Sequence, residues 1–281
     1  MMQNFNDYNA RILTLMSLYI NECPTAIDEK MMTDTLEYCG VDKERAFCIL
    51  LGGILNVYND RRFMKLYIEP MVKLLDAKQY TDNDYIKHIR INNAKSGDWK
   101  LAEAKYAPYE AFVYNESRIT DDGRLIPCIG FFDCEYTFPC VMQDEREWML
   151  ITPNEIETMK KPIEKAHGDV LTYGLGLGYF PFMTSQKENV KSVTVVEKDA
   201  TVIKLFEENI LSQFPHKEKI KIVNADAFEY ATTMPKYDFV FADIWHDPSD
   251  GINAYKKFKS LERLDVEYSY WIEDTIKYYM K

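Results

Sequence analysis

Apolar residues recur at helical spacing through the first third of the chain. Between Asn6 and Ile20 they fall on one face of a helix, and the same spacing continues beyond it. Gly40 is a plausible helix stop, and Gly52-Gly53 lowers the helix propensity of its segment. We therefore expect an N-terminal helical region over residues 1–95, with no catalytic motif. Its further predicted helices are residues 31–38, 44–58, 62–75 and 84–93.

Strand-forming residues replace this pattern in the next segment. Residues 105–115 and 125–142 are rich in Tyr, Phe, Val, Ile and Cys, and Asp121-Asp122-Gly123 between them supplies a turn. These segments predict a β-hairpin or small meander within a β-rich region, residues 96–147. One more strand is expected over residues 148–151.

A helix start follows at Thr152. Thr152 can cap the helix, Pro153 suits its first position, and Glu155 completes the S/T-x-x-E capping box. We expect this helix to run to about Lys165, with Gly168 beyond its end.

From Asp169 onward, short apolar runs alternate with helical segments. The run over residues 192–197 is almost continuously apolar, which suits a parallel strand covered on both faces. Such alternation predicts an α/β fold with a doubly wound, mostly parallel sheet and right-handed crossovers, over residues 148–281. The other expected strands are residues 170–173, 220–223 and 239–242, and the expected helices begin at Pro181 or span residues 200–209 and 226–232.

Three glycines stand between the first of these strands and its helix. Gly174, Gly176 and Gly178 predict a turn whose backbone can approach a ligand closely, with N–H groups directed at it. The spacing is G-x-G-x-G, because Tyr179 stands where the dinucleotide motif has its last glycine. The turn therefore indicates a nucleotide site and disfavours NAD.

Acidic residues end or follow the next three strands. Glu197 lies about twenty residues after the turn, where an acid can accept hydrogen bonds from ribose hydroxyls. Asp226-Ala227 follows the third strand, where a carboxylate can bind an adenine amino group or cap the next helix. Asp243 ends the fourth strand. Because the carboxyl ends of parallel strands share one edge of a sheet, we expect these groups to meet there.

At these residues the sequence resembles the nucleotide-binding core of class I S-adenosylmethionine-dependent methyltransferases, closest to their spermidine-synthase-like branch. The resemblance covers residues 169–248 and rests on the segments around Glu197, Asp226-Ala-Phe-Glu-Tyr230 and Asp243, with Asp247-Pro248 after it. It implies a Rossmann-like fold with S-adenosylmethionine as cofactor. The cofactor-binding residues that it implies are Gly174, Leu175, Gly176, Gly178, Glu197, Lys198, Asp226, Ala227 and Asp243.

Two departures separate the chain from true spermidine synthases. Leu177 stands where those enzymes carry an aspartate for the aminopropyl donor, and Thr152-Pro-Asn-Glu155 lacks their tyrosine motif for the polyamine. The sheet of the superfamily also continues through three more strands after the fourth. Only one is expected here, near residues 268–272, before a final helix, so we expect a sheet truncated at the C-terminus.

The loop after the fourth strand holds the candidate catalytic residues Asp243, His246 and Asp247, one of which could orient or deprotonate a nucleophile. Asp250 could join them in a metal site, but one histidine among acids is also an ordinary polar loop, and we assign no metal. The leading function is methyl transfer to a small molecule or peptide. The alternatives are aminopropyl transfer from decarboxylated S-adenosylmethionine and non-catalytic nucleotide binding.

The amino-acid composition limits the classes of molecule that the protein is expected to bind. The net charge of −11 disfavours nucleic acid, which needs a basic face. We also read no signal peptide and no segment long enough to span a membrane. The six cysteines form no C-x-x-C pair, which favours reduced thiols in the cytoplasm. The partner we expect is a small-molecule acceptor, and the resemblance adds a homodimer as a further expectation.

Overall fold

The computed structural model describes residues 5–144 and 146–280. Contacts divide the chain into two compact units: Met1–Tyr80 with Lys105–Thr137, and Thr81–Ala104 with Phe138–Lys281. The units alternate along the chain, whereas composition suggested three consecutive regions with boundaries at residues 95 and 147. Residues 81–104 group with the C-terminal part, which a change in composition could not reveal.

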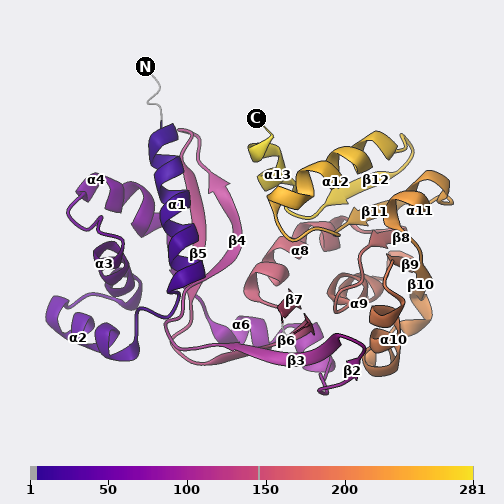
Figure 1. The fold of residues 1–281 in the computed structure, drawn as a ribbon, viewed down its shortest axis with the longest axis horizontal. Helices are drawn as coiled ribbons and strands as arrows, with labels where there is room; N and C mark the ends of the chain where they lie inside the picture. Colours follow the sequence, from indigo (N-terminus) through magenta and orange to yellow (C-terminus); the bar gives the residue numbers. More distant parts are fainter. Residues whose placement is uncertain (1–4, 145, 281) are drawn as a thin grey trace. The chain divides into compact units, whose positions relative to one another are not determined.

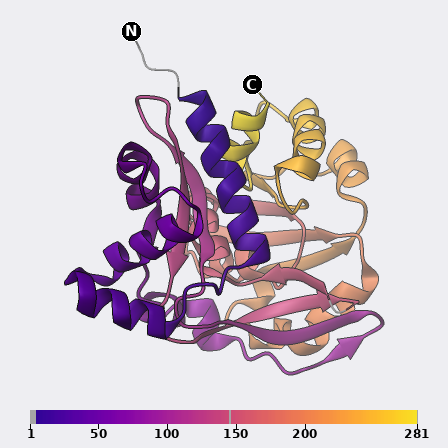
Figure 2. The same ribbon diagram turned by 60° about the vertical axis from the view of Figure 1, so that its left-hand side comes forward.

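The first unit is a three-stranded sheet covered by helices. The strand order is β1-β5-β4, with β1 parallel and β4 antiparallel to β5. Helix α1 lies along β5 in both views of the ribbon (Figures 1 and 2). The elements are α1 (Asn6–Glu22), α2 (Glu29–Cys39), α3 (Lys43–Ile54), α4 (Arg61–Phe63), the π-helical η1 (Met64–Ile68), α5 (Glu69–Met71), β1 (Val72–Leu74), α6 (Ala77–Thr81), β4 (Phe112–Ile119) and β5 (Leu125–Phe131).

Three helices predicted in the N-terminal region are wrong in extent. The one over residues 62–75 is a broken helix followed by β1, because Val72 is extended and its strand pairs with β5. The one over residues 44–58 ends at Ile54, where the carbonyl of Gly52 accepts from the N–H groups of Val57 and Tyr58. The third, residues 84–93, is only α7 (Asp84–His88), because the Gln213 side chain bonds the backbone of Arg90.

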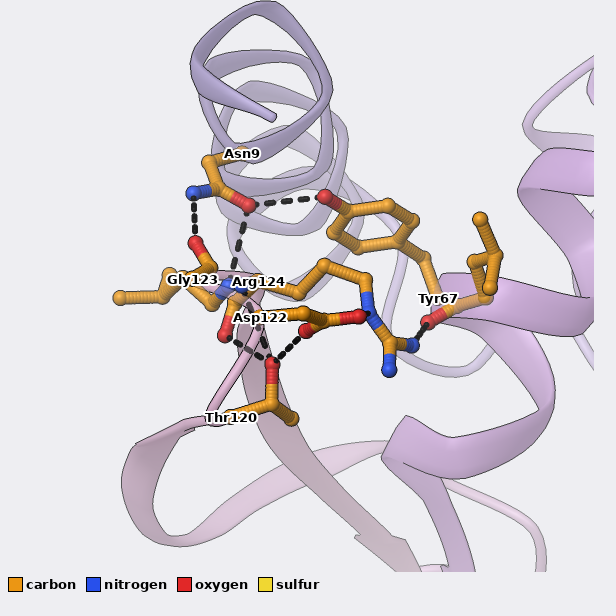
Figure 3. A network of polar contacts seen from close by, with 8 residues as sticks. Asn9, Tyr67, Thr120, Asp122, Gly123 and Arg124 are labelled. Atoms are coloured by element: carbon orange, nitrogen blue, oxygen red, sulfur yellow. Dashed lines mark hydrogen bonds and ion pairs between the residues drawn. The ribbon is translucent and has the colours of Figure 1, made fainter. Parts of the chain in front are cut away.

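The β4–β5 hairpin is fastened to α1 by a buried amide. The turn at residues 121–123 forms as predicted, and Gly123 adopts a φ of +86°. Asn9, which is 4 % exposed, donates to the Gly123 carbonyl at 3.0 Å. Its Oδ1 accepts from the Leu125 N–H at 2.9 Å and from the Tyr67 hydroxyl at 2.8 Å (Figure 3). One side chain of α1 thus forms hydrogen bonds with both the β4–β5 hairpin and η1.

The turn itself is held by a second set of polar contacts. Arg124 donates to both carboxylate oxygens of Asp122 and to the Leu66 carbonyl (Figure 3). The Thr120 hydroxyl also donates to Asp122, and this bond together with Arg124 lowers the pKa of the Asp122 carboxyl.

The second unit contains a five-stranded sheet in the order β10-β9-β8-β11-β12, parallel throughout (Figure 1). This confirms the predicted doubly wound α/β fold. The final strand and helix also form as predicted, and the sheet of the described residues ends at β12. The elements are β8 (Gly168–Tyr173), α9 (Tyr179–Ser185), β9 (Val190–Glu197), α10 (Ala200–Asn209), η2 (Leu211–Gln213), η3 (Lys217–Lys219), β10 (Ile220–Asn224), α11 (Ala227–Thr233), β11 (Phe239–Ala242), α12 (Pro248–Leu261), β12 (Glu267–Tyr270) and α13 (Glu273–Tyr279).

Successive side chains of β8 and β11 point to opposite faces of this sheet. Leu171, Tyr173 and Val240 share a buried cluster with α11, α12 and α13. On the opposite face Phe180 of α9 stacks on Phe241, with ring centroids 4.4 Å apart. Helix α9 begins at Tyr179, two residues before the predicted start, because Gly178 in the left-handed region already caps it.

A smaller sheet and one helix precede the parallel sheet. The smaller sheet has the order β2-β3-β6-β7, and β3 and β6 run from one unit to the other along the chain. Its strands are β2 (Lys95–Ser96), β3 (Trp99–Tyr106), β6 (Tyr136–Gln143) and β7 (Arg146–Leu150), and the helix is α8 (Pro153–Lys165). No helix of the described residues is both long and apolar enough to cross a membrane.

Asn9→Ala should destabilise the protein by about 1–3 kcal/mol for each group that it leaves buried without a partner. The control Asn21→Ala lies on the same helix, where Asn21 is exposed. Urea unfolding followed by circular dichroism should show a lower midpoint for Asn9→Ala alone. Equal midpoints would mean that the amide does not hold the hairpin.

Candidate functional site

The glycine turn has a backbone that other residues rarely adopt. Gly174, Gly176 and Gly178 have φ values of +97°, +49° and +76°. A Cβ at Gly174 would collide with the main-chain oxygen of Asp243, and one at Gly176 with the sulfur of Met149. Backbone conformation and lack of space both require glycine at these positions.

Leu177 of this turn is buried, and both of its backbone groups are hydrogen-bonded. It is fully buried, its N–H donates to the Met149 sulfur at 3.2 Å, and its carbonyl accepts from the Tyr85 hydroxyl at 2.6 Å. Asn83 donates to the Tyr179 hydroxyl at 2.9 Å, so residues around α7 fasten both the turn and the helix after it.

Glu197 joins the glycine turn to the next loop. Its Oε2 accepts from the Leu175 N–H at 3.2 Å, and its Oε1 accepts from the Asp199 N–H at 2.9 Å. A carboxylate oxygen can accept a second hydrogen bond, so both retain capacity for ribose hydroxyls. Asp199 caps α10 and accepts from the Trp99 indole at 3.0 Å, whereas Lys198 between the two acids is exposed.

The structure confirms the capping role considered for Asp226. Its Oδ1 accepts from the N–H groups of Phe228 and Glu229, at 2.9 and 3.1 Å. Asp226 is exposed and Ala227 is buried, and both lie beside the end of β10. Because only one carboxylate oxygen is used in the cap, capping is compatible with an additional contact to a base.

The acidic residues of the loop after β11 have two different roles: some cap helix α12, and one lines a cavity. Asp247 caps α12 by accepting from the Ser249 N–H at 2.6 Å, and Asp250 completes that capping box. Asp250 also accepts from His246, whose Nδ1 lies 3.1 Å from Oδ2. The His246 ring meets Trp148 edge to face, with centroids 4.4 Å apart. Asp247 is thus engaged in the helix cap, whereas Asp243 and His246 face a cavity.

This cavity has a volume of about 460 Å³ at the carboxyl ends of β8, β9, β10 and β11. The strand order explains how distant parts of the sequence meet there. Gly178 and Asp247 do not line it. The expected site residues that do are Gly174, Leu175, Gly176, Glu197, Lys198, Asp226, Ala227, Asp243 and His246.

Glu155 is a cavity residue that the sequence analysis missed. The interpretation as a capping box is half right, because Thr152 accepts from the Glu155 N–H while the Glu155 carboxyl lines the cavity. The side chain is 7 % exposed, and its Oε1 has no hydrogen-bond partner in the described chain. No separate sequence signal marked this role, because Glu155 also fits the local capping pattern with Thr152.

Glu155 and Asp243 influence each other's protonation. Burial raises the pKa of Glu155, and the Asp243 carboxylate raises it further. Removal from bulk water likewise raises the pKa of Asp243. Ionising both carboxyls at once is unfavourable, because their negative charges repel each other and both groups are removed from bulk water.

Within the described ranges, no three His, Cys, Asp or Glu side chains gather as metal ligands would. All six cysteines are free thiols.

Comparison with known proteins gives likenesses of fold only. No protein-family model matches the chain, and neither does any curated protein. Among solved structures, a spermidine synthase from Thermotoga maritima is 17% identical, with a TM-score of 0.33 over 47% of this chain and 48% of that one. A dimethyladenosine transferase from Plasmodium falciparum is 19% identical, with a TM-score of 0.30 over 39% and 37%. The matched parts span under half of each of those two chains.

Gly174→Ala should destabilise the protein by at least about 1–3 kcal/mol, because alanine at this φ is strained and its Cβ meets the Asp243 carbonyl. The matched control is Gly53→Ala in α3, where a Cβ meets no atom within 4 Å and helix propensity improves. Thermal unfolding should show a lower Tm only for Gly174→Ala. An unchanged Tm would contradict the steric account of the turn.

Glu155→Gln should stabilise the protein increasingly as pH rises. The wild-type carboxyl has a raised pKa when folded, so ionisation above its unfolded pKa costs folding free energy, and the amide avoids this cost. The gain should reach about 1–3 kcal/mol at pH 8–9 and shrink toward pH 4.

The control for this variant is Glu164→Gln, which changes an exposed residue of the same helix. Thermal melts at pH 4, 6 and 8.5 compare the two. A Tm difference for Glu155→Gln that stays constant across this range would show that the buried carboxyl does not titrate as inferred.

Proposed function

We propose that the chain is an S-adenosylmethionine-dependent methyltransferase acting on a small molecule or peptide. The observation that supports this most is one cavity lined by Gly174, Glu197, Asp226 and Asp243, from the ends of four adjacent parallel strands. A glycine turn with an acid at the end of the following strand fits a nucleoside with two free ribose hydroxyls.

The residues present fit this cofactor. The Glu197 carboxylate has spare acceptor capacity for the ribose, and the second oxygen of Asp226 can take the adenine amino group. The bound cofactor supplies a sulfonium methyl group. The protein's part is to hold the acceptor in line with the methyl–sulfur bond and to remove its proton. Asp243 and His246, which both line the cavity, are the candidates for this proton transfer.

Aminopropyl transfer remains the alternative, but Leu177 does not favour it. Its side chain is fully buried and does not line the cavity, so this position supplies no carboxylate for the amine of a decarboxylated donor. A non-catalytic nucleotide-binding protein would need the cofactor contacts but no converging groups beyond them.

Isothermal titration with S-adenosylhomocysteine should show binding that Glu197→Ala weakens at least about tenfold, because hydrogen bonds to a charged acceptor are lost. The matched control is Glu207→Ala, an exposed acid on α10 outside the cavity. Absence of binding to wild-type protein would refute the cofactor assignment. Tighter binding of the decarboxylated donor than of S-adenosylmethionine would favour aminopropyl transfer instead.

A further inference from the structure

One side chain from a different sheet contacts the glycine turn directly. Met149 lies on β7, the edge strand of the small antiparallel sheet, and lines the cavity together with Gly174 and Gly176. Its sulfur accepts a hydrogen bond from the Leu177 N–H at 3.2 Å. The same sulfur packs against Gly176, where a Cβ would collide with it. One thioether therefore contacts two consecutive residues of the turn.

This contact requires an unmodified sulfur. A thioether is apolar and only a weak hydrogen-bond acceptor, so it packs on Gly176 at little cost. An oxygen atom added to the sulfur has no space on the side of the turn, because the Leu177 nitrogen is 3.2 Å from the sulfur and an N–H···O bond alone spans about 2.7–3.2 Å. A sulfoxide therefore either moves away from the turn or directs its oxygen into the cavity.

Both positions of a sulfoxide interfere with a ligand on the turn. If the sulfur moves away, the Leu177 N–H loses its acceptor and the turn loses its contact with β7. If the oxygen points into the cavity, it occupies space next to Gly176, which lines the cavity. Conversion of an apolar side chain into a polar one is unfavourable in either case.

The Met149 side chain can be reached from solvent. It is half-buried, and Glu147 and Trp148 of the same strand, which also line the cavity, are exposed. Met159 lines the cavity as well but is only 1 % exposed. A small oxidant that enters the cavity therefore reacts at Met149 in preference to Met159.

We propose that Met149 is a redox-sensitive clasp on the glycine turn, through which a peroxide switches off cofactor binding. This inference rests on the proposed function for the identity of the ligand and adds a regulation of the same site.

The chemistry of the switch balances. The sulfur lone pair attacks one oxygen of hydrogen peroxide, the O–O bond breaks, and water leaves. The sulfur is oxidised by two electrons to the sulfoxide, and the peroxide is reduced by the same two electrons. A thiol-dependent methionine sulfoxide reductase reverses the step, because two thiols become a disulfide and the sulfoxide oxygen leaves as water.

The test treats the protein with hydrogen peroxide, follows the sulfoxide at Met149 by peptide mass spectrometry, and titrates S-adenosylhomocysteine by calorimetry. Oxidised wild type should bind this ligand at least about tenfold more weakly than untreated wild type. Methionine sulfoxide reductase with dithiothreitol should restore the affinity. Bound S-adenosylhomocysteine should slow the oxidation of Met149, because a ligand on the turn covers the sulfur.

Met149→Leu keeps an apolar side chain of similar size without an oxidisable sulfur. It should bind S-adenosylhomocysteine within about threefold of untreated wild type, and peroxide should not change this affinity. The matched control is Met280→Leu, which removes an exposed methionine outside the cavity and should lose affinity on oxidation as wild type does.

Three results would overturn the inference. The first is an equal loss of affinity in Met149→Leu on oxidation. The second is unchanged binding by wild type whose Met149 is fully oxidised. The third is a Met149 that stays reduced at a peroxide concentration that converts Met280.

Absence of binding to untreated wild type would refute the proposed function alone. Thermal unfolding then tests the clasp: peroxide should lower the Tm of wild type and of Met280→Leu by more than that of Met149→Leu. The same decrease in all three proteins would overturn the clasp.

Discussion

The site depends on the close contact between the glycine turn and the end of β11. At Gly174 there is no room for a Cβ beside the Asp243 carbonyl, so β8 and β11 can end at the same level only with glycine there. Glu197 then ties the turn to the loop after β9 through the N–H groups of Leu175 and Asp199. Three strand ends are thereby held together before any ligand arrives, which lowers the ordering cost of binding.

A second constraint is electrostatic. Polar groups around the cavity are largely satisfied by the protein: Asp226 and Asp247 cap helices, and Asp250 accepts from His246. Two buried polar atoms around the cavity are exceptions: Glu155 Oε1 and Trp245 Nε1 have no partner among the described residues. Asp243 is the charged neighbour of Glu155. Such a carboxyl lowers stability, and proteins commonly carry costs of this kind at functional sites.

Much of the second unit could be predicted from sequence because its signals are local. Alternating apolar runs and helical segments place β8 to β11, and the acids at their ends follow from parallel topology. The predictions were wrong where a partner distant in the sequence determines the local backbone structure. Val72 is extended because it pairs with Ile129, and Arg90 leaves its helix because Gln213 bonds its backbone. Glu155 satisfied a local capping pattern, so nothing in the sequence indicated that its carboxyl faces the cavity.

The central claim is that this cavity holds the adenosyl cofactor with its ribose on Glu197. A crystal structure of the protein with S-adenosylhomocysteine tests it most directly. We predict both ribose hydroxyls within hydrogen-bonding distance of the Glu197 carboxylate and the adenine beside Asp226, with the sulfur toward Asp243 and Glu155. Density for the ligand elsewhere on the protein, or a ribose bound without Glu197, would contradict the account.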